Sequence, residues 1–402
     1  MAETAFDVIE GGLLVADGFV AAAAAAGIKP QGLDMMLLHS RAPASAAATI
    51  TTNRFRAAPT YVTERHVADG SARTVIANSG NANAATGVRG MENAERMVEL
   101  AARETQVPVD ETLVCSTGRI GAQLPMEAIE AAIPDLCVGL SRDSARDAAR
   151  AIMTTDTVPK ECSVELEIGG RRVGIGAIAK GAGMICPNMA TMLCFICTDA
   201  AIEAPVLQGA LREAVERSFN CIAVDGDMST NDTVIALANG QAGNEAISDP
   251  ESTPFRDFAA ALDYVTRDLA KKIARDGEGA SKFVQVRVTG AESWQEARAV
   301  GRAVTRSNLV KTCIFGEDFN WGRIAAAVGA SGVEVDPARC AIAIGGVLAF
   351  EAGGPVDYDE DAAAAVMSAD EVQIDIDLRL GRETAVCWTC DMTPQYVELN
   401  AK

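Results

Sequence analysis

One hydroxyl side chain, Thr191, stands where a glycine-rich stretch meets an apolar run, in KGAGMICPNMATMLCFICTDA from Lys180 to Ala200. A threonine hydroxyl is a weak nucleophile, and one base that can activate it is its own α-amino group, which requires a cut just before the residue. Attack of the hydroxyl on the Ala190 carbonyl, followed by hydrolysis of the ester, would free that amine. From the residues alone, the alternative is a threonine packed at the start of a strand.

Histidine is scarce in this chain. Only His39 and His66 are present, which excludes a histidine-rich metal site. A histidine base for Thr191 would have to be one of these two residues. The sequence therefore favours a base other than histidine.

The eleven cysteines occur in a chain without export signals, which indicates reduced thiols. Two CxxC pairs, Cys194/Cys197 and Cys387/Cys390, have a spacing that zinc ligands use. Both pairs lie inside strand-like runs and not in the tight turns of metal knuckles. We interpret them as buried thiols, with a metal or redox site as the alternative.

Several polar, glycine-rich stretches directly follow apolar runs. Their backbone amides can donate to an oxyanion or a carboxylate, because glycine permits close approach and unusual dihedrals. Taken singly, each is more often an ordinary turn. None has the phosphate-binding pattern GxxxxGK[ST], and no GxGxxG stands at a strand-to-helix step, so nucleotide binding is not indicated. The stretches are NSGNANAATG (78–87), CSTGRIGAQLP (115–125), KGAGM (180–184), DGDMSTNDT (225–233) and GEDFNWGR (316–323).

Helical and strand-like segments interleave along the chain and must position these loops. The interleaving predicts an α/β or α+β fold with mixed sheets and no internal repeat. The apolar run 192–197 predicts a strand buried on both faces, and the alternation over 372–380 predicts a half-exposed strand. Helical periodicity covers 91–105, 141–156, 206–220, 254–277 and 293–309, and strand-like runs cover 73–80, 111–118, 162–170, 190–198, 233–240, 282–290, 340–346, 372–381 and 384–392.

Composition limits the possible partners. The 402 residues carry a net charge of -20, which disfavours general binding to nucleic acid or to an anionic membrane. An anionic substrate would therefore need a locally positive pocket. The alanine-rich N-terminal region contains Glu3, Asp7, Glu10 and Asp17, the wrong charges for a signal peptide, and no segment reaches the about 18 apolar residues of a membrane helix. We expect a cytoplasmic protein.

The stretch around Thr191 closely resembles the signature of the ornithine acetyltransferase (bifunctional glutamate N-acetyltransferase) family of arginine biosynthesis. Further blocks resemble the family in the same order across nearly the whole chain. The resemblance implies a mixed α/β (α+β), self-cleaving N-terminal-nucleophile enzyme with the ornithine acetyltransferase/DmpA-like fold. The other blocks are GFVAAAAAAGIK (18–29), NSGNANAATG (78–87), CSTGRIG (115–121), MTTDTVPK (153–160), DGDMSTNDT (225–233), RDGEGASK (275–282), NWGRI (320–324) and YVELN (396–400).

The resemblance implies a precursor that cuts itself between Ala190 and Thr191. The products are an alpha chain, 1–190, and a beta chain, 191–402, that stay associated, usually as an α2β2 assembly. Thr191 would take the acetyl group from N2-acetylornithine, and glutamate would accept it in a ping-pong cycle that yields ornithine and N-acetylglutamate. No cofactor or metal is expected, because an acetyl amide is already the donor; use of acetyl-CoA as a second donor stays open.

The resemblance also assigns roles to individual residues. Lys180 is a cation suited to the substrate α-carboxylate, and Glu278 is a natural counter-ion for the free ammonium of acetylornithine. The implied set is Thr117 and Gly118 as the oxyanion hole, with Thr154, Lys180, Thr191, Glu278 and Asn400 as substrate contacts.

Two positions depart from the family pattern. Family members usually carry a terminal hydroxyl residue that touches substrate after the VELN block, whereas Ala401 and Lys402 follow Asn400 here. Phe319 stands where the family commonly has proline.

Two other functions compete with the transferase. An amidase or aminopeptidase of the related self-cleaving fold would pass the acyl group to water, but those enzymes generally use serine. A non-catalytic acidic binding protein is disfavoured by the joint presence of Thr117, Gly118, Lys180 and Thr191.

Overall fold

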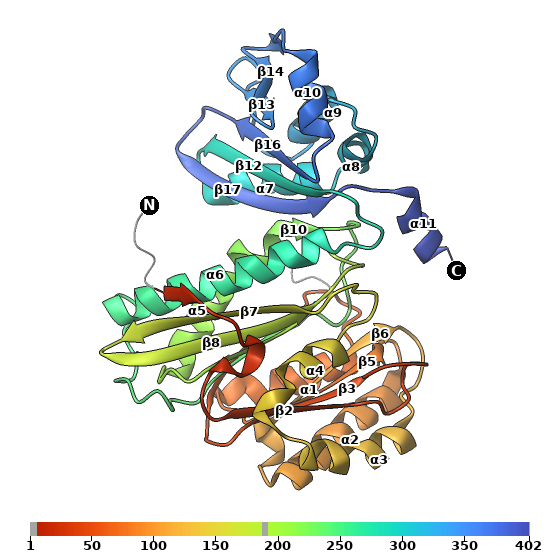
Figure 1. Ribbon diagram of the computed structural model, residues 1–402, viewed down its shortest axis with the longest axis vertical. Helices are drawn as coiled ribbons and strands as arrows, with labels where there is room; N and C mark the ends of the chain where they lie inside the picture. The colour runs from red at the N-terminus through yellow and green to blue at the C-terminus, as the bar shows by residue number, and fades with distance from the viewer. Residues whose placement is uncertain (1–5, 187–191, 402) are drawn as a thin grey trace. The chain divides into compact units, whose positions relative to one another are not determined.

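The computed structural model describes residues 6–186 and 192–401, and these form two compact units. The first unit contains residues 6–181, 192–219 and 228–269. The second contains residues 182–186, 220–227 and 270–401. Figure 1 labels the elements of both. The expected division into 1–190 and 191–402 concerns cleavage, and it does not coincide with this division by contacts.

The first unit contains two β-sheets. In the six-stranded sheet, the parallel pair β9 and β11 is flanked by antiparallel neighbours. In the four-stranded sheet, β5 and β6 run parallel. The strand order of the larger sheet is β1 (Phe6–Val8), β7 (Lys160–Ile168), β8 (Arg171–Lys180), β9 (Leu193–Thr198), β11 (Thr233–Ala238) and β4 (Ser45–Ile50), and that of the smaller is β2 (Phe19–Ala24), β3 (Met35–Ser40), β5 (Thr74–Asn81) and β6 (Thr112–Arg119).

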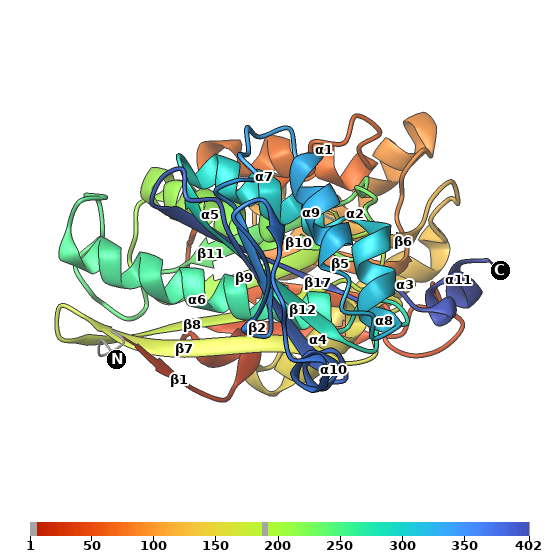
Figure 2. The same cartoon turned by 90° about the horizontal axis from the view of Figure 1, so that it is seen from above.

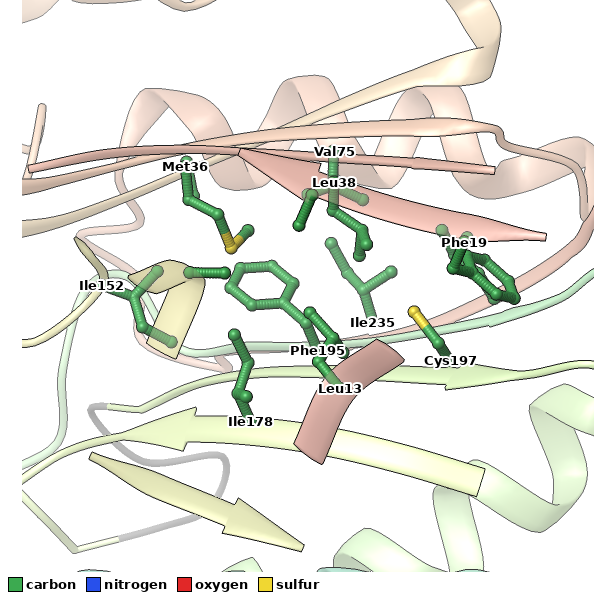
Figure 3. Packing of buried hydrophobic residues seen from close by; sticks show 14 of the residues in the cluster. Leu13, Phe19, Met36, Leu38, Val75, Ile152, Ile178, Phe195, Cys197 and Ile235 are labelled. Carbon is green, nitrogen blue, oxygen red and sulfur yellow. The ribbon is translucent and has the colours of Figure 1, made fainter. Parts of the chain in front are cut away.

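The main hydrophobic core of the first unit lies between these two sheets. Figure 3 shows Phe195 and Ile235 of the larger sheet meeting Met36 and Leu38 of the smaller one. Alternate residues of each strand point inward, so the two inner faces form one apolar layer. The helix before β7 adds Ile152 to this core.

Helices cover the outer faces of the two sheets. A second apolar cluster joins three of them, α1, α2 and α3, to the smaller sheet, and α5 packs against β4 of the larger sheet. The helices that begin in this unit are α1 (Ala58–His66), α2 (Gly87–Thr105), α3 (Met126–Val138), α4 (Ala145–Ala151), α5 (Ala204–Arg217) and α6 (Thr253–Arg275), with 3₁₀ turns η1 (Gly12–Val15), η2 (Val67–Asp69), η3 (Val109–Glu111) and η4 (Arg142–Ser144).

The second unit has its own mixed sheet and its own core. Strand β12 is parallel to β16 and antiparallel to β17, while α7 packs on β12 and β17 (Figure 2). The strand order is β10 (Ile222–Ala223), β17 (Glu383–Cys390), β12 (Phe283–Ala291), β16 (Glu371–Asp377), β13 (Ala341–Ile344), β14 (Val347–Glu351) and β15 (Gly354–Pro355), and the helices are η5 (Phe219–Cys221, at the boundary), α7 (Trp294–Thr305), α8 (Asn308–Phe315), α9 (Trp321–Gly329), α10 (Glu360–Met367) and α11 (Pro394–Asn400).

The expected mixed α/β class is confirmed, and so are the expected burial patterns. Every residue of β9 is buried, whereas β16 alternates between buried and partly exposed positions. The helix expected over 293–309 is wrong at its C-terminal end. Helix α7 ends at Thr305, and a new helix follows because the Ser307 hydroxyl accepts a hydrogen bond from the Val310 N–H and caps it.

The eleven cysteines are free thiols, and ten of them are buried. Cys194 and Cys197 are three apart in β9 and so point to opposite faces of the sheet. Burial raises the pKa of both thiols. Over 6–186 and 192–401 there is no group of three or more His, Cys, Asp or Glu side chains arranged to hold a metal ion.

None of the helices within 6–186 and 192–401 combines the length and the apolar character that a membrane span requires.

Candidate active site

One residue before their ends, the parallel strands β5 and β6 pair at two glycines, Gly80 and Gly118. Gly118 has φ of +133°, a conformation that side chains disfavour. A Cβ atom added to Gly118 would lie 2.3 Å from the carbonyl carbon of Gly80. Only glycine fits at this position, so no side chain covers the backbone at Gly118.

Asn231 joins three of the polar stretches of the sequence. Its side-chain amide donates to the carbonyl of Ala82 at 2.6 Å and to that of Ser116 at 2.7 Å. The Ser116 hydroxyl in turn donates to Asn78 Oδ1 at 2.6 Å. The sequence analysis singled out these stretches but not the individual residues. Polar side chains directly beside apolar runs were the feature that could have identified them.

Lys180 and Thr117 are in contact. Lys180 Nζ donates to Thr117 Oγ1 at 3.4 Å, and the two residues are 2% and 3% exposed. An ammonium can only donate, so the threonine hydroxyl accepts from it and keeps its own proton to donate. A hydroxyl polarised in this way is a suitable donor to an oxyanion.

Asp156 connects Lys180 to the loop that holds Thr154. Its carboxylate accepts hydrogen bonds from Thr154 N at 3.0 Å, Gly181 N at 2.6 Å and Lys160 Nζ at 2.6 Å. Burial by itself would raise the pKa of Asp156, but the charges of Lys180 and Lys160 and these hydrogen bonds lower it to about 2. Asp156 is thus ionised. It holds Thr154 through the backbone N–H and Lys180 through its charge.

Asp232 lies beside the chain that follows Thr191. Its Oδ1 accepts from the Met192 N–H at 2.9 Å, and this N–H belongs to the peptide bond that joins Met192 to Thr191. Among the described residues Oδ2 has no hydrogen-bond partner. Burial raises the pKa of this carboxyl well above its usual value, although Lys180 and the Met192 N–H oppose that shift. Sequence reasoning did not single out Asp232; a carboxylate directly before a buried strand was the available signal.

Ala190 and Thr191 lie outside the described residues. The chain is described again from Met192, and β9 begins at Leu193, which is the register partner of Lys180 in β8. Lys180 therefore pairs with a residue only two positions after Thr191.

Glu278 and Asn400 are in contact in the second unit. The Asn400 side-chain amide donates to Glu278 Oε2 at 2.8 Å, and the Glu278 N–H donates to the Ala182 carbonyl at 2.8 Å. Burial, together with the charges of Asp225, Glu278 and Asp227, raises the pKa of Tyr396 to about 12. The second unit therefore collects negative charge around its two candidate substrate contacts.

The candidate residues fall into two groups. Thr117, Gly118, Thr154 and Lys180 come together in the first unit, and Glu278 and Asn400 come together in the second.

Neither histidine contacts these groups in a described hydrogen bond. His39 Nδ1 meets Thr74 Oγ1 at 3.0 Å, and His66 Nδ1 meets the Thr112 carbonyl at 2.8 Å. Both rings therefore have structural partners in the first unit.

The chain is similar to known proteins over nearly all its length. The model of the ArgJ family matches residues 20–402. The arginine biosynthesis bifunctional protein ArgJ of Symbiobacterium thermophilum is 51% identical over 395 residues, 98% of each chain. The same-named protein of Caldanaerobacter subterraneus subsp. tengcongensis is 44% identical over 398 residues, again 98% of each. A solved structure of ArgJ from Bacillus halodurans is 46% identical with a TM-score of 0.50, and covers 52% of this chain and 97% of its own.

Proposed function

Because the chain belongs to the ArgJ family and is an acyltransferase of arginine biosynthesis, we propose that it carries the acetyl group on Thr191. N2-acetylornithine is the donor and glutamate the acceptor. The contact between Lys180 and Thr117 supports this proposal best. It places the Lys180 ammonium against the Thr117 hydroxyl. Lys180 is also the register partner of Leu193, which is two positions after Thr191.

The nucleophile arises by cleavage between Ala190 and Thr191. The Thr191 hydroxyl attacks the Ala190 carbonyl, the peptide becomes an ester, and water hydrolyses the ester to leave a free α-amine on Thr191. Asp232 supports this step because it holds the following peptide N–H at 2.9 Å. The half-length match to the solved relative is also in keeping with a chain that is cut near its middle.

The first half-reaction forms an acetyl ester on Thr191. The hydroxyl gives its proton to the α-amine and attacks the acetyl carbonyl of N2-acetylornithine. The Thr117 hydroxyl and the Gly118 N–H donate to the oxyanion, and each such donor contributes about 2.7–4 kcal/mol of barrier lowering. Collapse of the intermediate returns the proton to the nitrogen of departing ornithine. In the second half-reaction, the glutamate amine attacks the ester and leaves as N-acetylglutamate.

Two charged residues match the two charged groups of acetylornithine. Lys180 binds the α-carboxylate, with Thr154 held beside it through Asp156. Glu278 binds the ornithine side-chain ammonium, and Asn400 orients the Glu278 carboxylate. No cofactor or metal takes part, since the acetyl amide is already the donor. Use of acetyl-CoA as a second donor to glutamate is an additional arm of the assay below.

The two products of cleavage stay together in this proposal. Strands β8 and β4 precede the cut, β9 and β11 follow it, and β9 hydrogen-bonds to β8 as β11 does to β4. Separating the products would break these ladders and expose the core between the two sheets. An α2β2 assembly in the cytoplasm completes the proposal.

The experiment combines intact mass, N-terminal sequencing and an acetyl-transfer assay with acetylornithine or acetyl-CoA as donor to glutamate. Wild type should yield a second N-terminus at Thr-Met-Leu-Cys and acetylglutamate from acetylornithine. Thr191→Ala should abolish both cutting and turnover. An uncut wild-type chain would refute the mechanism and favour a non-catalytic binding protein.

The amidase alternative predicts a different product. Such an enzyme would release acetate from acetylornithine at a rate indifferent to glutamate. The ArgJ family match over residues 20–402 favours the transferase.

A further inference from the structure

A second cation, Lys29, lies at the same part of the first unit as Lys180. Its Nζ donates to the carbonyl of Met153, the residue before Thr154, at 3.0 Å. Its stem passes over Gly80, where an added Cβ would lie 2.7 Å from Lys29 Cγ. Gly80 is the strand partner of Gly118. Lys29 therefore reaches from the oxyanion strands to the Thr154 loop.

The backbone of Lys29 is held by a buried carboxylate. Asp34 is 0% exposed and accepts from Ala26 N at 2.6 Å, Ile28 N at 2.7 Å and Lys29 N at 3.0 Å. Three charge-assisted bonds to one carboxylate fix the loop that leads into Lys29. This lysine is thus a positioned group and not a mobile surface chain.

Lys29 and Lys180 repel one another. Burial lowers the pKa of the half-buried Lys29, the charges of Asp34 and Asp156 raise it, and the charge of Lys180 lowers it further. Two like charges near each other disfavour the charged forms, and a bound anion reduces that cost. In a chain of net charge -20, this pair makes the local surroundings suitable for carboxylates.

We propose that Lys29 binds the side-chain carboxylate of the acceptor glutamate, while Lys180 binds the α-carboxylate that both substrates carry. This inference rests on the proposed function. Acetylornithine has one carboxylate and glutamate has two, so the acceptor needs a cation that the donor does not. Lys160 is already paired with Asp156 at 2.6 Å, and Glu278 has the wrong charge for this carboxylate. Lys29 is therefore a determinant of acceptor specificity.

The test compares glutamate with glutamine, its neutral isostere, as acceptors of the acetyl group. Wild type, Lys29→Gln and Lys29→Arg are first acetylated with acetylornithine, and kcat/KM for each acceptor is then measured. Lys29→Gln should lower kcat/KM for glutamate about tenfold, as the loss of one charge-assisted hydrogen bond predicts, and should lower the glutamate-to-glutamine ratio by the same factor. Lys29→Arg keeps the charge and should keep most of the ratio. Arg54→Gln removes one positive charge from an exposed position of the same unit and should leave the ratio unchanged.

The outcomes separate this inference from the proposed function. If wild type forms no acetyl-enzyme, the proposed function fails. Wild type could transfer to glutamate while Lys29→Gln lowers kcat/KM for both acceptors by the same factor, or for neither. Either result overturns the specificity role of Lys29 and leaves the transferase function in place. A fall confined to glutamate, restored by Lys29→Arg, supports the inference.

Discussion

The polar cluster of the first unit and that of the second differ in charge and in burial. In the first unit Lys180, Lys160 and Asp156 are buried, and Asp156 has a pKa of about 2. In the second unit Glu278 is partly exposed and Asn400 is exposed, and the neighbouring charges are negative. The first cluster is fixed by a buried ion pair and by backbone hydrogen bonds to Asp156, whereas Glu278, the charged side chain of the second cluster that the Asn400 amide contacts, is partly exposed.

The proposed roles of the two clusters, binding the carboxylate and the ammonium of the donor, differ in what they require. The carboxylate end and the reacting carbonyl need a preorganised, water-poor surrounding in which a developing oxyanion is stabilised. The ammonium end needs only a counter-ion, which works at a solvated site. We therefore expect changes in the first cluster to cost stability or kcat, and changes in the second to cost KM.

The largest expected effect comes from Asp156→Asn. It removes the carboxylate that pairs with the buried Lys160 at 2.6 Å, and breaking a buried pair in this way costs about 3–5 kcal/mol. Urea unfolding should show that loss in the free energy of unfolding. Asp147→Asn is the matched control, because its pair with Arg150 is about half exposed on both sides and such pairs contribute about 0–1 kcal/mol. If both variants lost the same free energy of unfolding, the buried pair would be no more important for stability than the exposed one.

The next effect is on turnover. Thr117→Val removes the hydroxyl that accepts from Lys180, and kcat should fall about 10²–10³-fold, as for the loss of one oxyanion donor. KM should change little. Thr117→Ser keeps the hydroxyl and should retain most of the activity. If Thr117→Val turned over like wild type, Thr117 would have no part in stabilising the oxyanion.

The second cluster should affect binding. Glu278→Gln removes the proposed counter-ion of the ornithine ammonium and should raise KM for acetylornithine about tenfold, with kcat nearly kept. Glu292→Gln, at an exposed position of the same unit, is the control. Asn400→Ala should raise KM less, and combining it with Glu278→Gln should add little, because the two side chains share one hydrogen bond at 2.8 Å. An unchanged KM in Glu278→Gln removes Glu278 from this role.

The smallest expected effect is on the pH dependence of stability, and it comes from His39 in the first unit. Burial lowers the pKa of His39 from 6.5 to about 4, and Arg73 and Arg41 add to the shift. The unfolded chain therefore binds more protons between these values, so stability is full above pH 6.5 and falls as the pH drops toward 4. His39→Gln should flatten the dependence of Tm on pH in this window. If the slope were the same in both proteins, another group would account for it.

Much of the fold could be predicted from the sequence. Periodicity located nine strands and most of the long helices, because alternation and the 3.6-residue period report directly on burial. The strands that were not located include β2 and β4, since FVAAAA and SAAATI are short and rich in alanine, which has no strong strand preference. The helix over 293–309 was placed too long because one serine cap interrupts an otherwise helical pattern.

The candidate site divides in the same way. From the sequence, the family resemblance assigned roles to Thr117, Gly118, Lys180 and Glu278, because the motifs that carry them are contiguous. Only the tertiary structure brought Asp156, Asp232 and Lys29 to these residues, since their contacts join segments that are far apart in the chain. Local chemistry can be read along a chain, whereas burial, pairing and pKa depend on neighbours that only folding supplies.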